Sequence, residues 1–222
     1  MNPKVIRTIV SIVLIIIVIC FVWPFETPRQ GILIKSIGAP ISFKNEKRAR
    51  EELIVQRLKD IREAELLYKQ ANNKYTANFD TLINFCSTYE IPIVKMIPDP
   101  SDTTFSKTIN DTIGYKLVND SLFGKREGFQ LNELGIVPGS DPAVQFEIHD
   151  SIIKRNGISV PVFEAKTPFE VYLAKPGKKF TEKDWNTRVR NEKKELEDLD
   201  KYAGLKVGSL EEASTDGNWE KL

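Results

Sequence analysis

The first 25 residues constrain this chain more than any other segment. An unbroken apolar run extends from Thr8 to Phe25, and Lys4 and Arg7 precede it. The run has about the length of the roughly 17–25 residues that cross a bilayer core. A helix is the form in which such a segment satisfies its own backbone hydrogen bonds in lipid. We therefore predict a single transmembrane helix over residues 8–25.

The residues at the two ends of this run predict its orientation. Lys4 and Arg7 are the only basic residues before it, so the positive-inside rule keeps residues 1–7 in the cytoplasm. Trp23 is placed at the far interface, where amphipathic aromatic rings are enriched. Residues 26–222 are therefore predicted to be exported.

Two other fates of the N-terminal segment fit it less well. A cleavable signal peptide needs small residues before its cleavage site, and the run instead ends with Ile19, Cys20, Phe21, Val22 and Trp23. Lipoprotein processing at Cys20 needs a small residue before the cysteine, where Ile19 stands. An uncleaved anchor is therefore favoured.

One side of the predicted membrane helix can meet either lipid or a partner helix. Three isoleucines recur along that side, at Ile12, Ile16 and Ile19. Close packing between membrane helices uses pairs of small residues, which this side lacks, so lipid contact is the favoured interpretation.

Composition and cysteine usage limit the function classes. Lys and Arg number 32 against 31 Asp and Glu, so no basic excess points to nucleic acid as a partner. Cys20 lies in the predicted span and Cys86 in the exported part, so the two cannot form an intrachain disulfide. Cys86 is predicted to be a small buried side chain, with an intermolecular disulfide as the alternative.

After the membrane segment, we predict a neck and then a long helix. Prolines and glycines recur over residues 26–43 too often for a continuous helix, which predicts a neck there. Over residues 44–72, Ile54, Leu58 and Ile61 follow helical spacing on one face. The opposite face is charged and is predicted to be solvated or to bind a partner. The predicted partner-binding residues of this face are Arg48, Arg50 and Lys59.

The remainder of the exported part predicts a second helix and an antiparallel sheet of four to six strands. A short helix is expected over 79–89, capped by Asn78 or Asp80. Period-two patterns predict strands over residues 91–97, 112–118, 143–149, 151–155, 158–165 and 169–173. Asn156 and Gly157 predict a hairpin turn, and Pro161 within the second arm of the hairpin, residues 158–165, predicts that this arm is an edge strand.

The C-terminal part predicts a helix and a packed tail. Thr181 is the expected helix cap, with Asp184 three positions later, and Gly204 is the expected stop. The apolar content after Gly204 predicts that Trp219 packs back onto the domain.

Residues 57–82, RLKDIREAELLYKQANNKYTANFDTL, resemble the helix-to-loop junction of type IV pilins and of the pseudopilins of type II secretion. The resemblance implies a pilin-like exported domain of residues 44–222, in an inner-membrane protein whose domain lies in the periplasm. The apolar run lacks the glutamate of prepilins, and no glycine precedes it, so processing and polymerisation through the N-terminal helix are not implied. The chain as a whole also resembles a group of uncharacterised bacterial single-pass envelope proteins.

The sequence predicts no catalytic, cofactor or metal site. His149 is the only histidine, and strand alternation with Phe146 and Ile148 places it on an outer face. Neither a zinc-binding pattern nor a glycine-rich phosphate loop is present. Asp99, Asp102, Asn110 and Asp111 make an oxygen-rich stretch, but their spacing does not match that of an EF-hand calcium loop.

These observations together predict an α+β fold and a structural role. The expected architecture is a transmembrane helix, a long amphipathic helix packed on an antiparallel sheet, and a C-terminal helix. The expected function is that of a non-enzymatic assembly subunit of a cell-envelope complex, such as a secretion or pilus-like machine. Its expected partners are the bilayer and other envelope proteins, or further copies of itself. A sensor or ligand-binding domain is the alternative, and an enzyme is third.

Overall fold

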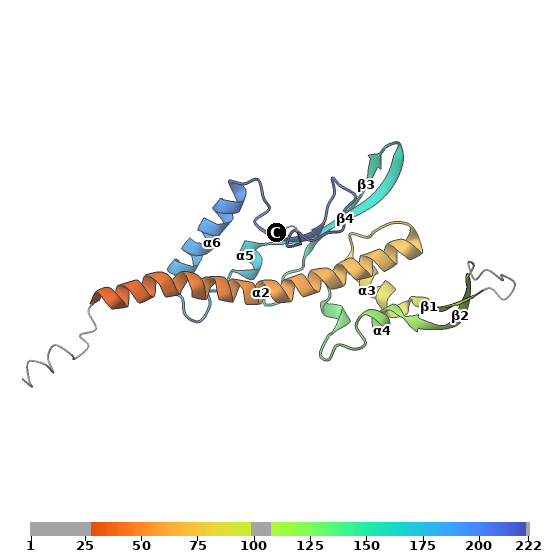
Figure 1. Ribbon diagram of the computed structural model, residues 1–222, viewed down its shortest axis with the longest axis horizontal. Coiled ribbons are helices and arrows are strands. Elements are labelled where there is room, and N and C mark those ends of the chain that lie inside the picture. The colour runs from red at the N-terminus through yellow and green to blue at the C-terminus, as the bar shows by residue number, and fades with distance from the viewer. Residues whose placement is uncertain (1–27, 99–107, 221–222) are drawn as a thin grey trace, which may run out of the picture. The chain divides into compact units, whose positions relative to one another are not determined.

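The computed structural model describes residues 28–98 and 108–220, with side chains described over 39–97 and 110–220 (Figure 1). The chain divides into two compact units, Met1–Lys44 and Asn45–Leu222, and helix α2 (Pro28–Asn72) runs through the division. The elements of the second unit that follow α2 are α3 (Phe79–Thr88), β1 (Glu90–Pro98), β2 (Thr108–Leu117), α4 (Val118–Leu122), a 3-10 turn (Leu131–Glu133), β3 (Glu147–Arg155), β4 (Ile158–Pro168), α5 (Phe169–Tyr172), α6 (Glu182–Glu197) and β5 (Gly204–Gly208).

The predicted membrane span lies outside the described residues, together with Ile12, Ile16, Ile19 and Trp23. Among the residues that are described, no helix has both the length and the apolar character to cross a bilayer. The transmembrane helix therefore stays a prediction from the sequence.

The expectation of an irregular neck over residues 26–43 is wrong from Pro28 onward, because α2 begins there. Proline is tolerated in a first helical turn, where its missing N–H has no partner within the helix. Pro40 lies inside the helix and removes one hydrogen bond, while the turns on either side remain helical. Ser42 Oγ donates a hydrogen bond to the carbonyl of Ala39 next to this proline (3.2 Å).

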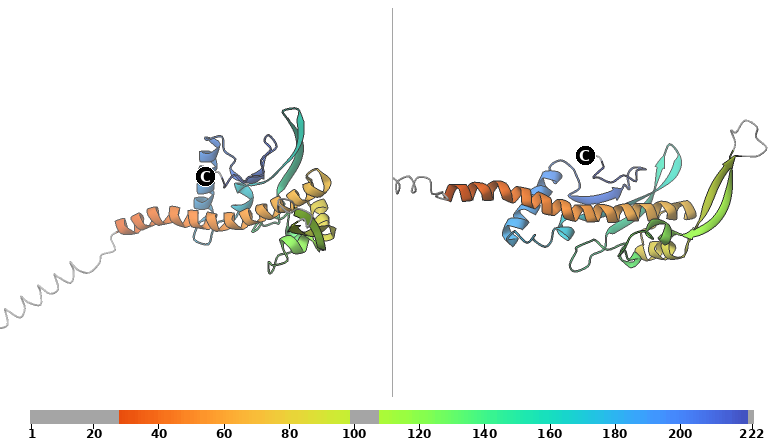
Figure 2. Two further views of the ribbon diagram at one scale, coloured as in Figure 1. Left: turned by 45° about the vertical axis from the view of Figure 1, so that its right-hand side comes forward. Right: turned by 60° about the horizontal axis from the view of Figure 1, so that its bottom comes forward.

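The apolar face predicted for α2 is confirmed within the second unit. Ile54, Leu58 and Ile61 have no exposed surface, and Ala64 continues the same face. These positions recur every three or four residues, so their side chains lie on one side of the helix. Within this unit, α2 lies between the β3–β4–β5 sheet and the α3–α4 segment (Figure 2).

Helix α3 follows its prediction closely. Asn78 is the cap, and its Oδ1 accepts a hydrogen bond from the Thr81 N–H (3.0 Å). The rings of Tyr68 on α2 and Phe85 on α3 meet edge to face, with 5.1 Å between their centroids. Cys86 is buried beside them as predicted, and this burial raises the pKa of its thiol to about 12.

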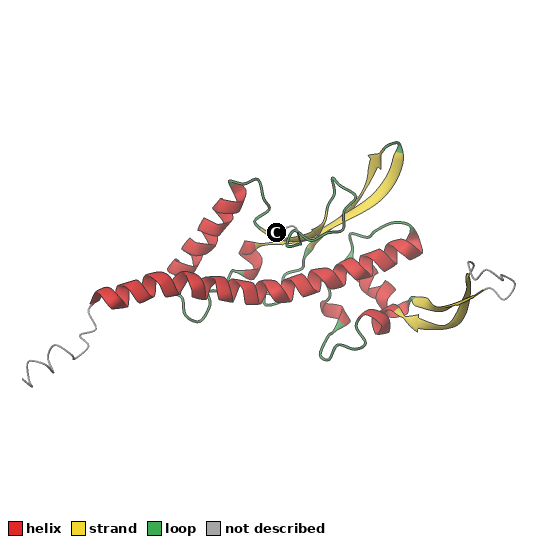
Figure 3. Cartoon of the chain, viewed as in Figure 1, coloured by secondary structure: helices red, strands yellow, loops and turns green. Residues whose placement is uncertain are grey.

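The strands of the described residues form two antiparallel sheets rather than one (Figure 3). β1 and β2 make a two-stranded ribbon, and β3, β4 and β5 make a second sheet in that order. α4 and the 3-10 turn lie between β2 and β3, and among the described strands β2 pairs with β1 alone. The mixed α+β class with antiparallel pairing is confirmed.

The hairpin predicted at Asn156 and Gly157 is confirmed, since both residues have the positive φ angles that a type I′ turn needs, 52° and 81°. The strand expected to begin at residue 143 begins instead at Glu147 as β3. The edge assignment from Pro161 is wrong, because β4 lies between β3 and β5. Pro161 fits this strand because β5 pairs only with its later part, Glu164–Pro168.

The strand expected over residues 169–173 is wrong, because Phe169–Tyr172 forms the short helix α5. The N–H of Phe169 bonds to the carbonyl of Ala203 (3.1 Å), and the turn that follows buries Phe169 and Tyr172. Phe169 and Tyr172 are three positions apart, so a strand would place their rings on opposite faces. The helical turn buries both rings instead.

The cap of α6 is confirmed, since Thr181 Oγ1 accepts a hydrogen bond from the Asp184 N–H (3.2 Å). The helix ends at Glu197, before the expected stop at Gly204, and Gly204 begins β5 instead. The tail packs back onto β5 as predicted, since the Asn218 N–H bonds to the Lys206 carbonyl (3.0 Å), and Trp219 next to it is half-buried.

Candidate interaction surface and ligand pocket

The three basic residues predicted to bind a partner do not form one surface. Arg48 is exposed, Lys59 is half-buried, and their spacing of three helical turns places them on the same side of α2. Arg50 lies on another side, where its Nη1 donates hydrogen bonds to the carbonyl oxygens of Tyr172 (3.0 Å) and Lys175 (2.8 Å). Arg50 therefore binds the chain's own C-terminal half.

Arg50 belongs to a set of contacts that joins α2 to α5 and α6. Its guanidinium lies 4.9 Å from the ring centre of Trp185, whose indole N–H donates to the Leu173 carbonyl (2.6 Å). One turn earlier, Lys47 forms an ion pair with Glu192 of α6. These contacts order much of the charged stretch that the sequence alone predicted to be solvated.

Tyr172 and Glu51 add a buried hydrogen bond to the same contact set. The Tyr172 hydroxyl donates to Glu51 Oε1 (3.1 Å). Burial raises the pKa of both groups, and the neighbouring Glu51 carboxyl adds to the shift at Tyr172. The partners lie more than one hundred positions apart in the sequence, so no local pattern could have indicated them.

Replacing Arg50 with alanine is expected to lower the free energy of unfolding by about 2 kcal/mol, because two carbonyl acceptors lose a charged donor. Arg48→Ala is the matched control: Arg48 is exposed, and the change is expected to stay within about 0.5 kcal/mol. Urea unfolding of the full-length chain in detergent, followed by tryptophan fluorescence, measures both. Equal effects of the two variants would contradict the structural role of Arg50.

The β1–β2 ribbon carries exposed apolar side chains on both of its strands. The exposed fractions are 43% for Ile93, 45% for Val94, 72% for Met96, 61% for Ile113 and 67% for Tyr115. Single exposed apolar residues are ordinary on protein surfaces, but five large ones on one short ribbon are a concentration that indicates an interaction site. The ribbon is therefore the first candidate interaction surface, and the sequence showed it only as two strands.

The edges of this ribbon are poor templates for adding a further strand. β1 contains Pro92, which has no N–H to offer to a neighbouring strand. In β2, Ile113 has no opposite residue, because Ile93 faces Gly114 and Val94 faces Thr112, so the strand is bulged there. A partner would therefore contact the ribbon through its side chains.

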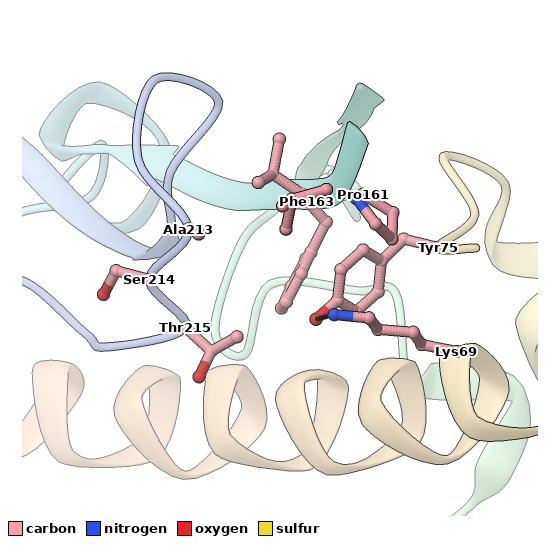
Figure 4. A pocket seen from close by; sticks show the side chains of 9 residues that line it. Lys69, Tyr75, Pro161, Phe163, Ala213, Ser214 and Thr215 are labelled. Atoms are coloured by element: carbon pink, nitrogen blue, oxygen red, sulfur yellow. Dashed lines mark hydrogen bonds between the residues drawn. The ribbon is translucent and has the colours of Figure 1, made fainter. Parts of the chain in front are cut away.

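A small cavity lies between the end of α2, strand β4 and the loop 213–215 (Figure 4). Its volume, measured together with its mouth, is about 260 Å³. The residues that line it are Lys69, Tyr75, Val160, Pro161, Val162, Phe163, Ala213, Ser214 and Thr215. The rings of Tyr75 and Phe163 pack together, with 4.7 Å between their centroids.

Glu65 is a buried carboxyl one helical turn before Lys69. It has no exposed surface; its Oε2 accepts a hydrogen bond from the Thr76 N–H (3.1 Å), and its Oε1 has no hydrogen-bond partner among the described residues. Burial raises the pKa of this carboxyl from its ordinary value of 4.5 to about 8, and the charge of Asp150 adds to the shift. Glu65 therefore carries a proton at neutral pH.

The other residues that the sequence singled out are His149 and the oxygen-rich stretch of Asp99, Asp102, Asn110 and Asp111. His149 is exposed while Phe146 and Ile148 are buried, as strand alternation predicted. Asp99 and Asp102 lie outside the described residues, and the residues that are described contain no cluster able to hold a metal ion.

Comparison with known proteins gives no relative: no family model, no curated protein and no solved structure matches this chain. The resemblance of residues 57–82 to pilins and pseudopilins therefore stays a prediction.

Proposed function

We propose that this chain is a non-enzymatic assembly subunit of a bacterial cell-envelope complex, of the secretion or pilus-like kind. Residues 8–25 would anchor it in the inner membrane with residues 26–222 in the periplasm. The β1–β2 ribbon would contact a neighbouring envelope protein. The observation that carries the proposal is the group of exposed apolar side chains on this ribbon, from Ile93 to Tyr115.

The ribbon has the properties of a contact arm. An isolated two-stranded ribbon is marginally stable in water, so a ribbon that keeps apolar side chains exposed gains from a partner that covers them. The charges on the ribbon cancel, so it has no net charge to repel a partner. Its described charged residues are Glu90, Lys95, Asp111 and Lys116. An apolar contact with a second protein fits these features better than an electrostatic one.

The test is the mass and composition of the complexes extracted from the native membrane in mild detergent. We expect the full-length chain to leave the membrane in a large assembly with other envelope proteins. The double variant Met96→Glu, Tyr115→Glu should release it as a small species, because two charges would have to be buried in the contact.

The matched control is Ile152→Glu on the β3–β4 hairpin, where the side chain is 67% exposed, the same fraction as Tyr115. This variant should leave the assembly intact. An assembly that survives the double variant would contradict the assignment of the ribbon. Extraction of the unchanged chain alone, as a monomer or as a self-assembled oligomer, would contradict a neighbouring protein as the partner.

A ligand-binding or sensor domain is the second candidate. The specific observation that favours it is the cavity beside Lys69 and Tyr75, which combines apolar walls with a charged group.

A further inference from the structure

We propose that the cavity between α2, β4 and loop 213–215 binds a small aliphatic monocarboxylate. Lys69 would hold the carboxylate, and the β4 wall would cover the aliphatic chain. This inference does not depend on the assembly role of the ribbon, and it gives the ligand-binding alternative a definite ligand class.

The cavity walls are mostly apolar. Val160, Pro161, Val162 and Phe163 come from one stretch of β4, and Ala213 faces them from the C-terminal loop. Sites for small molecules combine such walls with a few placed polar groups, and they usually measure about 300–1,000 Å³. Even with the open space of its mouth included, this cavity measures only about 260 Å³, so its enclosed part is smaller than such sites and limits the ligand to a short chain.

The polar groups gather on the α2 side of the cavity. Lys69 Nζ lies 3.4 Å from the Tyr75 hydroxyl and 4.8 Å from the centre of its ring. Figure 4 shows these two side chains converging, with Phe163 and Thr215 beside them. The ammonium and the hydroxyl can both donate to one carboxylate, which accepts through two oxygens.

Lys69 has no carboxylate partner within the described part of the chain. Glu65 stands one turn earlier on α2, the spacing at which Glu and Lys commonly pair. Its carboxyl instead turns into the core, where it accepts the Thr76 N–H. The nearby Arg62 is already bonded to Glu220 (2.9 Å) and to the Thr215 carbonyl (3.4 Å). Lys69 is therefore the cation that is available to form an ion pair with a bound anion.

The donor set selects a monoanion. Phosphate sites in proteins collect several backbone N–H groups or an arginine fork, whereas the side chains that line this cavity offer one ammonium, that of Lys69, and the hydroxyls of Tyr75, Ser214 and Thr215. A cationic ligand would be repelled by the positive charge of Lys69. An uncharged alcohol would contact the apolar walls but would form no ion pair with the Lys69 ammonium.

The test uses the full-length chain in a non-ionic detergent and three probes of equal chain length: hexanoate, hexanol and hexylammonium. We expect hexanoate to raise the unfolding temperature in a saturable way, because a ligand that binds only the folded state stabilises it. Hexanol and hexylammonium, which partition into the same micelles, should not raise it at equal concentration.

Lys69→Met should weaken hexanoate binding about tenfold or more, because it removes the charged donor and keeps the length of the side chain. Lys74→Met, at an exposed position in the turn after α2, is the matched control and should bind as the unchanged chain does. Ala213→Trp should abolish binding by filling the mouth of the cavity, and it tests the site independently if Lys69→Met does not fold.

Each other outcome overturns the proposal. The absence of any response to hexanoate would show that the cavity takes no such ligand. An equal response to hexanol would show apolar filling without carboxylate recognition. Unchanged binding in both Lys69→Met and Ala213→Trp would place the hexanoate elsewhere on the protein or in the micelle.

Discussion

Replacing Arg126 with alanine is expected to lower the free energy of unfolding by about 3 kcal/mol, because it leaves a buried carboxylate without its charged partner. Asp60 on α2 is only 4% exposed, and its two oxygens accept hydrogen bonds from Nη1 and Nη2 of Arg126. Without Arg126, the side-chain donor that remains is Gln56 Nε2, at 3.0 Å. The guanidinium groups of Arg126 and Arg57 both lie near the Phe129 ring, 5.3 Å and 5.2 Å from its centre.

Urea unfolding of Arg126→Ala, Asp60→Ala and the double variant measures this effect and separates its parts. Asp60→Ala should cost less, because the Arg126 side chain is 38% exposed and can return to water. The double variant should cost little more than Asp60→Ala alone, since neither charge is left buried. Lys125→Ala, at the exposed neighbouring position, is the control and should change little. Strict additivity of the two single effects would contradict the coupling.

The second large effect is a loss of stability with rising pH that depends on Glu65. The pKa of this carboxyl is about 8 in the folded chain and ordinarily 4.5, so the folded state holds the proton more tightly than the unfolded state does. The free energy of unfolding should therefore fall as the pH rises from about 4.5 to about 8, and this contribution should be constant above that. One pKa unit corresponds to about 1.4 kcal/mol, so the total loss is at most on the order of 4–5 kcal/mol.

Glu65→Gln is expected to remove this contribution. Glutamine keeps an oxygen for the Thr76 N–H but carries no charge to desolvate. Denaturation measured from pH 5 to pH 9 should show a smaller slope for the variant, which should be the more stable chain at pH 9. Glu63→Gln, exposed on the same helix, is the control and should follow the unchanged chain. A slope that is unchanged in Glu65→Gln would show that other groups cause the pH dependence.

The features that were predicted correctly from the sequence depend on residues close together in the chain. Asn78 and Thr181 cap their helices through N–H groups three positions later. The Asn156–Gly157 turn follows from the φ angles that these two residues accept. The buried face of α2 follows from the spacing of Ile54, Leu58 and Ile61. Each of these is a local property, because the groups that interact lie within about two helical turns.

Three of the errors came from reading local preferences of proline, glycine and apolar alternation. The proline and glycine content of residues 26–43 indicated an irregular neck, whereas α2 is helical from Pro28. Alternation of apolar residues indicated a strand after Pro168, whereas the Ala203 carbonyl fixes the Phe169 N–H at the start of a helical turn. Pro161 indicated an edge strand, but β5 pairs with the later part of β4 and makes it the central strand. In the last two cases a distant segment of the chain selected the arrangement, whereas the helix over residues 28–43 accommodates Pro28 in its first turn and Pro40 within it.

The sequence by itself determined the α+β class, the main helices and turns, and the apolar segment that predicts a membrane anchor, because periodicity and capping act between near neighbours. Only the tertiary structure decided what the charged and polar side chains do. It directs Arg50 to the carbonyls of Tyr172 and Lys175, pairs Asp60 with Arg126, and turns Glu65 away from Lys69 into the core. These contacts join residues far apart in the chain, and their energies come from burial, which no local pattern of residues encodes.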